Sequence, residues 1–405
     1  MAFELTNAQR KYFGLDPLES HWDRVALKDD HPAEGFLFYE GDIIKRHIIS
    51  VDFRYSERNY NELTRNRTVL LPKTSKGKEK KLSSSTLGQR NPIGVYLEVN
   101  GHGVITIGNY TTQTTFYSSR WDKPELAIER PIEETVAEFI SQSRTDHLSQ
   151  IEKFKRGKRK RVRFRAGDYF SFKLTRELFG FGRVLLDINR LRKSGLLAEK
   201  HGLNLLMGPP VLVQLFAFSS PTQRIDIAEL ERVPKLPSDV MFDNLLLYGE
   251  YELIGHKELN NDDFEFPISY GRSIDGRPIV FLQWGLIHRE LPLSDFNKYL
   301  VEENPNAPIG SYSRNVTNPF GYYSIGLRPS FDSDDIFRTI NSDGNYDFDS
   351  NKHFTAIFDL RNPRNQHKRR EILKAFGLDP DGPYEKNRST TGTPATTDII
   401  RALSE

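Results

Sequence analysis

The densest group of side chains that could bind a charged ligand is a basic run between residues 153 and 165. Clustered Lys and Arg side chains displace counterions from phosphates, so the run indicates nucleic-acid binding. Single-strand binding also favours interleaved aromatic side chains, and only Phe154 and Phe164 interrupt the run. A solvated segment at a domain boundary has the same composition, so both interpretations stay open. The run consists of Lys153, Lys155, Arg156, Lys158, Arg159, Lys160, Arg161, Arg163 and Arg165.

The histidines and carboxylates form no familiar metal or catalytic motif. His-x-His, His-Glu-x-x-His and Cys pairs are missing, and so are Gly-x-Ser-x-Gly and a phosphate loop. Residues 343–349 alternate oxygen ligands but lack the Gly and Glu positions of an EF-hand, which favours a turn. The adjacent pairs Asp262-Asp263 and Asp334-Asp335 are typical of solvated loops. We therefore predict no catalytic residue, no cofactor and no metal, although a site assembled by the fold from distant residues leaves no such motif.

Composition limits the class of protein. A chain of 405 residues suggests two or three domains, and 27 Phe and 17 Tyr supply enough apolar surface for packed cores. A net charge of +2 does not fit a general polyanion binder. Cysteine is absent, Met1–Arg10 has no apolar stretch, and no segment approaches the roughly 20 apolar residues of a membrane helix. These features predict a cytoplasmic protein without a membrane span.

Patterning predicts an α+β fold that is rich in strands. The clearest element is a hairpin over residues 94–107, where we expect Asn100-Gly101 to supply positive φ angles at the turn. Pro131 begins a helix expected to reach about Phe154 and to pack on both neighbouring domains. Tyr384–Thr397 has the composition of a disordered segment. Further strands are expected at 35–39, 46–55, 111–118, 211–218, 248–255 and 279–286, and helices at 185–197 and 368–376.

These elements suggest four segments. Residues 1–125 form a β-rich N-terminal domain, and residues 126–157 form a helical connector. Residues 158–295 form a second domain, built as a small twisted β-barrel or sheet. Residues 296–405 form a C-terminal extension with a disordered end.

The second domain opens with a hairpin whose faces can be assigned. Phe170, Phe172 and Leu174 alternate onto one face, and Tyr169, Ser171 and Lys173 onto the other. After a turn at 175–178, Phe179 and Phe181 share a face, with Gly180 and Gly182 opposite. Glycine inside a strand usually marks a bulge or a close backbone approach, so Gly182 is expected to be needed for packing.

This opening resembles the immunity protein 26 family. The similar residues are Arg165-Ala-Gly-Asp-Tyr-Phe-Ser-Phe-Lys-Leu174 and Phe179-Gly-Phe-Gly-Arg-Val-Leu185, and the resemblance covers about residues 160–290. Where the family usually has Trp in a later strand, this chain has Tyr251. The family-motif residues expected to be structural are Gly167, Asp168, Phe170, Gly180, Gly182 and Arg183.

The resemblance implies a bacterial immunity protein of a polymorphic toxin system, which binds a cognate toxin and neutralises it without catalysis. By charge complementarity we expect an acidic surface to face the toxin, and the alternative is that the acidic segments are solvated loops. Two other functions stay open: a nucleic-acid-associated protein that uses the run at 153–165, and an enzyme with an unrecognised site. The candidate partner-binding residues are Asp262, Asp263, Glu265, Asp334 and Asp335.

Overall fold

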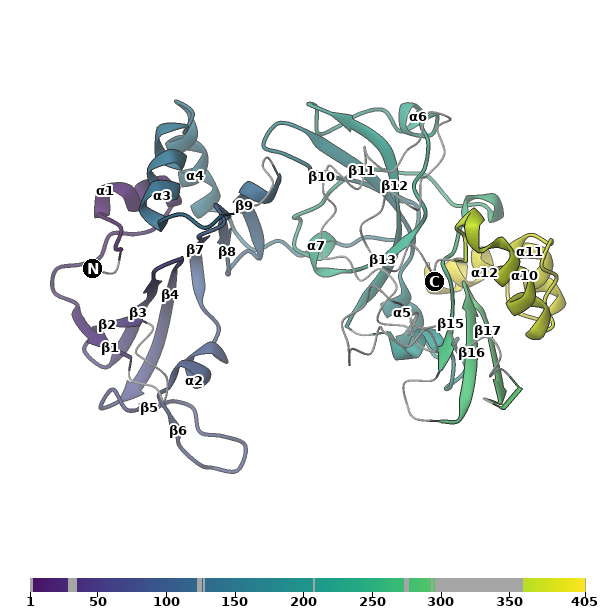
Figure 1. Cartoon of the computed structure of the whole chain (residues 1–405), viewed down its shortest axis with the longest axis horizontal. Coiled ribbons are helices and arrows are strands. Elements are labelled where there is room, and N and C mark those ends of the chain that lie inside the picture. Colours follow the sequence, from purple (N-terminus) through teal and green to yellow (C-terminus); the bar gives the residue numbers. More distant parts are fainter. Residues whose placement is uncertain are drawn as a thin grey trace. The chain divides into compact units, whose positions relative to one another are not determined.

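The computed structural model describes residues 3–27, 35–121, 126, 128–206, 208–272, 277–292, 294–295 and 360–404. The chain divides into two compact units (Figure 1). Unit 1 comprises Met1–Val162 with Tyr248–Glu250, and unit 2 comprises Arg163–Leu247 with Tyr251–Glu405.

Unit 1 is built on one antiparallel sheet with strand order β1-β2-β3-β4-β7-β8-β9, and the short strands β5 and β6 extend it from β4. Its strands are β1 Asp23–Ala26, β2 Gly35–Glu40, β3 Ile43–Val51, β4 Arg54–Arg65, β5 Val69–Leu70, β6 Lys80–Lys81, β7 Ile93–Asn100, β8 Ile105–Asn109 and β9 Thr114–Ser118. Its helices are α1 Asn7–Arg10, η1 Lys11–Phe13, α2 Ser84–Gly88, η2 Ser119–Trp121, α3 Ile132–Ser141 and α4 His147–Lys155.

The predicted hairpin is confirmed as β7 and β8, but the positive φ lies elsewhere in its turn. Gly103, not Gly101, has the positive φ, at 78°. Gly101 is needed for a close approach, because a Cβ there would lie 2.8 Å from the Cβ of Phe53. Its N–H donates to the carbonyl of Phe53 at 2.8 Å, which ties the turn to the β3–β4 connection.

The expected single helix from Pro131 is two helices. α3 ends at Ser141 and α4 begins at His147, after the polar residues 142–146. Ser and Asp side chains compete for backbone hydrogen bonds, and the Ser143 hydroxyl donates to the carbonyl of Phe139 at 2.9 Å. Both helices pack on the sheet of unit 1: Val136 and Ile151 are fully buried in its core. They are therefore part of that unit's core and not a separate connector.

A buried cluster of charges fixes the N-terminal segment of unit 1 to its sheet. The carboxylate of Glu57 is fully buried and accepts from Arg10 Nε at 3.0 Å, from Tyr55 Oη at 2.6 Å and from Arg46 Nη1. Charges taken out of water are tolerated only when they are paired, so these four side chains depend on one another.

Unit 2 contains a five-stranded antiparallel sheet of order β13-β12-β11-β10-β14 and a three-stranded sheet of order β15-β16-β17. The α+β class is confirmed, and the first sheet is open, with β13 and β14 as its edges, so it is not a closed barrel. The strands are β10 Asp168–Lys173, β11 Phe179–Leu186, β12 Pro210–Ser220, β13 Asp239–Phe242, β14 Glu252–His256, β15 Ile268–Arg272, β16 Ile279–Trp284 and β17 Ile287–Pro292. The helices are α5 Ile188–Lys193, η3 Gly202–Leu205, α6 Ile227–Leu230, α7 Asn244–Leu247, η4 Asn261–Asp263, η7 Pro363–Asn365, α10 Gln366–Ala375, α11 Tyr384–Thr390 and α12 Thr396–Ser404.

The predicted faces of the β10–β11 hairpin are confirmed. Phe170 and Phe172 pack in one core, where Tyr251 stacks on Phe170 with ring centroids 5.5 Å apart. Tyr169 and Phe181 pack in a different core on the opposite face. Tyr251 thus completes an aromatic cluster with Phe170 and Phe172.

The prediction of disorder at Tyr384–Thr397 is wrong, because this region forms α11 and the start of α12. Tertiary contacts outweigh its composition. The Tyr384 ring lies 4.7 Å from that of Phe266, and its hydroxyl accepts the N–H of Leu286 at 3.0 Å. The buried amide of Asn387 donates to the carbonyl of Asp379 and accepts the N–H of the same residue.

The C-terminal helices also complete a core and do not form a separate extension. Ile372 and Leu373 of α10 are fully buried in one cluster with Phe281 and Leu282 of β16.

Candidate functional site

Gly167, the first motif residue, is required by its conformation and its surroundings. Its φ is 92°, a region that side-chain-bearing residues rarely adopt. A Cβ at this position would lie 2.4 Å from the carbonyl oxygen of Lys257. The backbone N–H of Lys257 also donates to the carbonyl of Gly167 at 3.1 Å. Gly167 therefore allows the chain just after β14 to lie directly against the start of β10.

Asp168, at the start of β10, holds the end of the neighbouring strand β14. Its Oδ1 accepts from Nδ1 of His256 at 2.7 Å, and its Oδ2 accepts the backbone N–H of Arg165 at 2.8 Å. The residue itself is 8% exposed. Because an ionised carboxylate only accepts hydrogen bonds, Nδ1 of His256 is the donor in this contact.

Arg183 makes the largest set of contacts. Its guanidinium is 2% exposed and donates from Nη2 to the carbonyls of Lys257 and Glu258, at 3.0 and 3.2 Å. Nη1 donates to Oδ1 of Asp263 at 3.0 Å. The guanidinium carbon also lies 4.9 Å from the ring centroid of Tyr169, within the range of a cation–π contact. Lysine has no planar fork and cannot reproduce this arrangement.

Three motif residues therefore converge on one stretch of chain. Gly167, Asp168 and Arg183 all contact residues 256–263, which we call the anchored segment. The anchored segment includes most of the acidic stretch that the sequence points to as a partner surface. The motif residues thus hold the anchored segment in position, in addition to packing the β10–β11 hairpin.

The predicted acidic residues have different roles. Asp262 is exposed, whereas Asp263 pairs with Arg183 and is 14% exposed at its side chain. Glu265 accepts from the backbone N–H of Ser238 at 2.5 Å and pairs with Arg361 at 2.9 Å. The predicted pair Asp334 and Asp335 lies outside the described residues, as does the stretch at 343–349 considered for calcium.

The structure adds polar residues that the sequence did not single out. Glu231, just after α6, accepts from Oη of Tyr169 at 2.9 Å and from Nζ of Lys257 at 2.5 Å. The Lys257 ammonium lowers the pKa of Glu231, and burial raises the pKa of Tyr169. Tyr169 and Glu231 are 62 positions apart, and no local pattern joins them. Lys257 and Glu231 thus form a charged rim beside the anchored segment.

In some enzymes an Asp side chain orients a His that acts as a general base. Asp168 and His256 could in principle form such a pair. Such a base needs a nucleophile or a bound water within about 3 Å. Among the described residues, no hydrogen bond joins His256 to a hydroxyl group, and no group of three or more His, Asp or Glu is placed to hold a metal. The pair links β10 to β14, and its geometry alone does not define a reaction.

The basic run is mostly exposed, with no regular secondary structure after α4. Lys155 pairs with Asp16, and Arg165 lies 4.0 Å from Asp168. Arg159 lies over the ring of Tyr248, 4.4 Å from its centroid.

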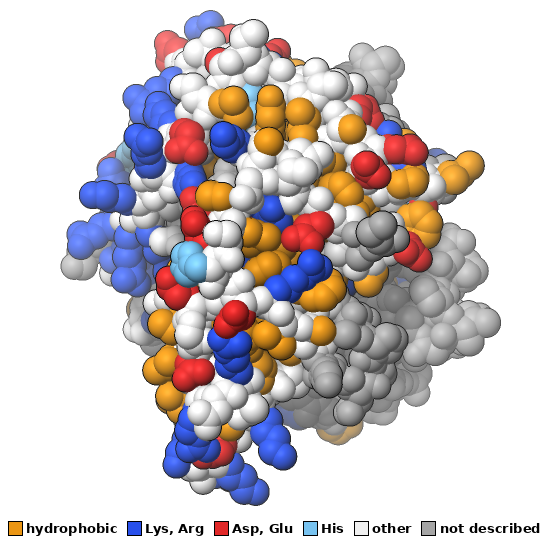
Figure 2. Space-filling view, turned by 90° about the vertical axis from the view of Figure 1, so that its left-hand side faces the viewer, with side chains coloured by type: hydrophobic (Ala, Val, Ile, Leu, Met, Phe, Trp, Pro, Cys, Tyr) orange, Lys and Arg blue, Asp and Glu red, His pale blue; other side chains and the backbone are white. Residues whose placement is uncertain are grey.

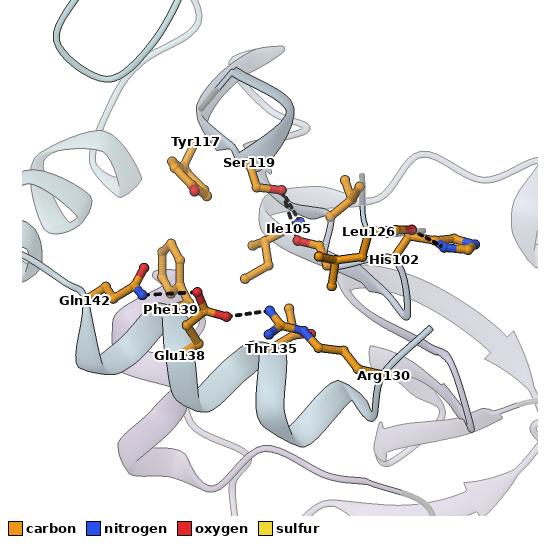
Figure 3. A pocket seen from close by; sticks show the side chains of 12 residues that line it. His102, Ile105, Tyr117, Ser119, Leu126, Arg130, Thr135, Glu138, Phe139 and Gln142 are labelled. Carbon is orange, nitrogen blue, oxygen red and sulfur yellow. Dashed lines mark hydrogen bonds and ion pairs between the residues drawn. The ribbon is translucent and has the colours of Figure 1, made fainter. Parts of the chain in front are cut away.

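Unit 1 holds a cavity of about 310 Å³ beside α3 (Figure 3). Apolar side chains of Ile105, Leu126 and Phe139 form part of its wall. Arg130 pairs with Glu138 at 2.6 Å, so the polar groups in Figure 3 largely bind one another. The full set of lining residues is His102, Gly103, Val104, Ile105, Tyr117, Ser119, Leu126, Arg130, Thr135, Glu138, Phe139 and Gln142.

Residues 165–277 match the model of the immunity protein 26 family. The match contains the hairpin, its motif residues and the whole anchored segment, and it confirms the resemblance for this segment of the chain. Searches among curated proteins and among solved structures give no match. The matched family indicates a role in toxin immunity.

A helix crosses a bilayer only if it is both long and apolar. Within the described ranges, none is both long and apolar enough to cross a bilayer.

Proposed function

We propose that this protein is an immunity protein that binds a cognate toxin and neutralises it without catalysis, inside the bacterial cell that produces both. The family match at residues 165–277 supports the class. The observation that carries the proposal is the convergence of Gly167, Asp168 and Arg183 on the anchored segment. A binding surface gains affinity when it is ordered before the partner arrives, because less conformational entropy is lost.

The partner surface we propose consists of exposed carboxylates on the anchored segment. Glu258 and Asp262 are exposed, and no ion pair of either is recorded among the described residues. Asp263 lies beneath them and neutralises Arg183. The outward charge of the segment is therefore negative, which complements a basic surface on the toxin and steers the encounter. Glu265 belongs to the support of this surface, through its pair with Arg361.

The test must distinguish carboxylates that contact the toxin from carboxylates that only hold the anchored segment in place. Neutralising Asp263 or Glu265 would break buried or half-buried pairs, so loss of protection would not locate the surface. The variant Glu258→Gln/Asp262→Asn changes only exposed side chains. Its matched control is Glu133→Gln/Glu134→Gln, which removes the same charge from the exposed first turn of α3.

Both variants are expressed in cells exposed to the cognate toxin, and survival and toxin affinity are measured. We expect the first variant to weaken toxin binding at least tenfold, mainly through the association rate at low salt. The control should protect like the wild type. Equal protection by both variants, with unchanged affinity, would exclude the anchored segment as the toxin-facing surface.

A further inference from the structure

A projecting ribbon in unit 1 has a charge pattern unlike that of its surroundings. β5 (Val69–Leu70) pairs with β6 (Lys80–Lys81) in antiparallel register, and β5 also pairs with the end of β4. The loop between β5 and β6 extends beyond the end of the sheet (Figure 1). We call residues 69–81 the lysine finger.

The tip of the lysine finger is an ordered turn. The N–H of Thr74 donates to the carbonyl of Lys78 at 2.8 Å, and the N–H of Lys78 donates back to Oγ1 of Thr74 at 3.1 Å. The N–H of Gly77 donates to the carbonyl of Thr74 at 2.8 Å, and Gly77 has a φ of 73°. These bonds close the tip on itself, so its backbone is organised before any ligand arrives.

The lysine finger carries positive charge that no other described residue pairs with. Its single acidic residue, Glu79, pairs with Arg65 at the base of the ribbon. Figure 2 shows Lys and Arg side chains gathered at the lower end of the unit 1 face, where the finger projects. No ion pair with a described residue is recorded for any of its lysines, which are Lys73, Lys76, Lys78, Lys80 and Lys81.

Elsewhere in unit 1, by contrast, most arginine side chains form ion pairs with carboxylates. Arg58 pairs with Glu98, and Arg67 pairs with Asp23 at 2.6 Å. Other described arginines of the same unit that lie within 4.0 Å of a carboxylate are Arg10, Arg24, Arg46, Arg65, Arg90, Arg130, Arg144 and Arg156. Among the described residues of unit 1, exposed cations without an ion pair therefore gather on the finger and on residues 158–161 of the basic run, which the experiment below compares.

The side chains of the finger suit one kind of negatively charged partner better than others. Residues 73–79 include no aromatic side chain, so the tip cannot stack on unpaired bases as single-strand binders do. They include no apolar side chain either, so the tip has nothing to insert below the headgroups of a membrane. Lysines act as point charges toward phosphates, and a two-stranded ribbon fits the major groove of a duplex.

From these features we infer that the lysine finger binds the phosphate backbone of a double-stranded nucleic acid without reading its sequence. Lysines of the tip and of β6 contact phosphates, and the ordered turn sets the spacing of those at the tip. The inference is independent of the proposed toxin binding, which uses unit 2.

The experiment measures binding of the full chain to a fluorescent 20-base-pair DNA duplex, to the matching RNA duplex, to the single strand and to phosphatidylserine vesicles, across a salt series. The finger variant is Lys73→Gln/Lys76→Gln/Lys78→Gln. The charge-matched control is Lys11→Gln/Lys200→Gln/Lys374→Gln, whose lysines are exposed and dispersed. A third variant, Lys158→Gln/Lys160→Gln/Arg161→Gln, tests the basic run.

We expect the finger variant to lose about tenfold or more in duplex affinity at 100 mM salt, and its slope of log affinity against log salt to fall by about 2 to 3. The control should keep most of its affinity, and the duplex should bind more tightly than the single strand. Comparing the affinities for the DNA duplex and the RNA duplex shows which of the two is the preferred partner. Three outcomes would each overturn the inference: equal loss in finger variant and control, loss only in the basic-run variant, or binding to phosphatidylserine vesicles without duplex binding. Unchanged unfolding temperatures for all variants keep these outcomes interpretable.

Discussion

Arg183 and Asp263 are 80 positions apart in the sequence, yet Nη1 of one lies 3.0 Å from Oδ1 of the other. The pair joins the centre of the β10–β11–β12 arrangement to η4, at the end of the anchored segment. Because Arg183 also donates to two carbonyls of that segment, a single guanidinium fixes both of its ends.

Replacing Arg183 with Met should lower the free energy of unfolding by about 3 kcal/mol, because two carbonyls lose their donor and the largely buried Asp263 keeps, among the described residues, only Lys235 at 4.0 Å as an ionic partner. Arg183→Lys should restore only part of the loss, since an ammonium cannot serve all three acceptors. Urea unfolding measures the loss, and hydrogen exchange of the amides at 257–263 measures the order of the segment. Asp262→Asn, on an exposed neighbour, is the control. Unchanged exchange in Arg183→Met would show that the segment is held in some other way.

Gly182→Val should destabilise unit 2 by at least about 1–3 kcal/mol. A Cβ at this position would lie 2.4 Å from Cζ of Phe170 and 2.8 Å from Cδ2 of Leu215, so the core face has no space for a side chain. Thermal unfolding gives the measurement. Gly88→Val adds the same group where nothing lies within 4 Å, and it should cost far less. Equal melting temperatures for both variants would contradict the packing argument.

Acid should destabilise unit 2 through His201. Nδ1 of His201 accepts the N–H of Leu203 at 3.2 Å, so Nε2 carries the proton and donates to the carbonyl of Leu286 at 3.1 Å. Burial lowers the pKa of His201 to about 4. The unfolded chain takes up its proton near pH 6.5 and the folded chain only near pH 4, so stability falls as pH falls through this window.

The size of this effect is up to about 3 kcal/mol, from 1.36 kcal/mol for each pKa unit. Urea unfolding of wild type and His201→Gln at pH 7, 5.5 and 4.5 measures it. The variant should show a smaller loss of stability on acidification. His47, whose pKa burial also lowers to about 4, contributes a similar loss in unit 1 and should keep its share in the variant. An identical pH dependence in wild type and variant would rule out His201 as the source.

Glu265 and Arg361 should show energetic coupling of about 1 kcal/mol in a double-mutant cycle. Their pair at 2.9 Å connects the residue after Phe264 to the start of the C-terminal region, and both are partly screened by solvent. The cycle uses Glu265→Gln, Arg361→Met and the double variant, each measured by urea unfolding. Additive losses from the two single variants would mean that the ion pair is not a stabilising contact.

Limited trypsin digestion should cut first between residues 155 and 165 or between 74 and 85. Both stretches are rich in exposed Lys and Arg, and the first has no regular secondary structure after α4. Mass spectrometry of the early fragments identifies the sites. Protection of both stretches, with early cuts elsewhere, would contradict this expectation.

Local patterns predicted the parts of the fold that are decided locally. Alternation placed Phe170 and Phe172 on one face of a strand, and the turn signal at Asn100-Gly101 marked the β7–β8 hairpin. In both cases neighbours in sequence are also neighbours in space. The same reasoning missed the break between α3 and α4, because the apolar stripe continued beyond it.

The candidate site depends on contacts between distant residues, which sequence patterns do not encode. Asp262 and Asp263 look alike in the sequence, but only Asp263 faces Arg183. His256 is 88 positions from Asp168, and nothing near either residue indicates the partner. For the C-terminal helices, composition suggested disorder because it takes no account of the partners that bury Tyr384 and Asn387.

The hydrogen bond between Tyr384 and the backbone of Leu286 can form only late in synthesis, after residue 384 has been added. A ribosome must add 98 residues after Leu286 before the acceptor of its N–H exists. Until then the β16 and β17 ribbon lacks the helices that cover Phe281 and Trp284. A chain that stops early therefore exposes apolar side chains that attract chaperones and proteases. A chain that ends before Tyr384 therefore differs, in the apolar surface it exposes, from one that includes α10, α11 and α12.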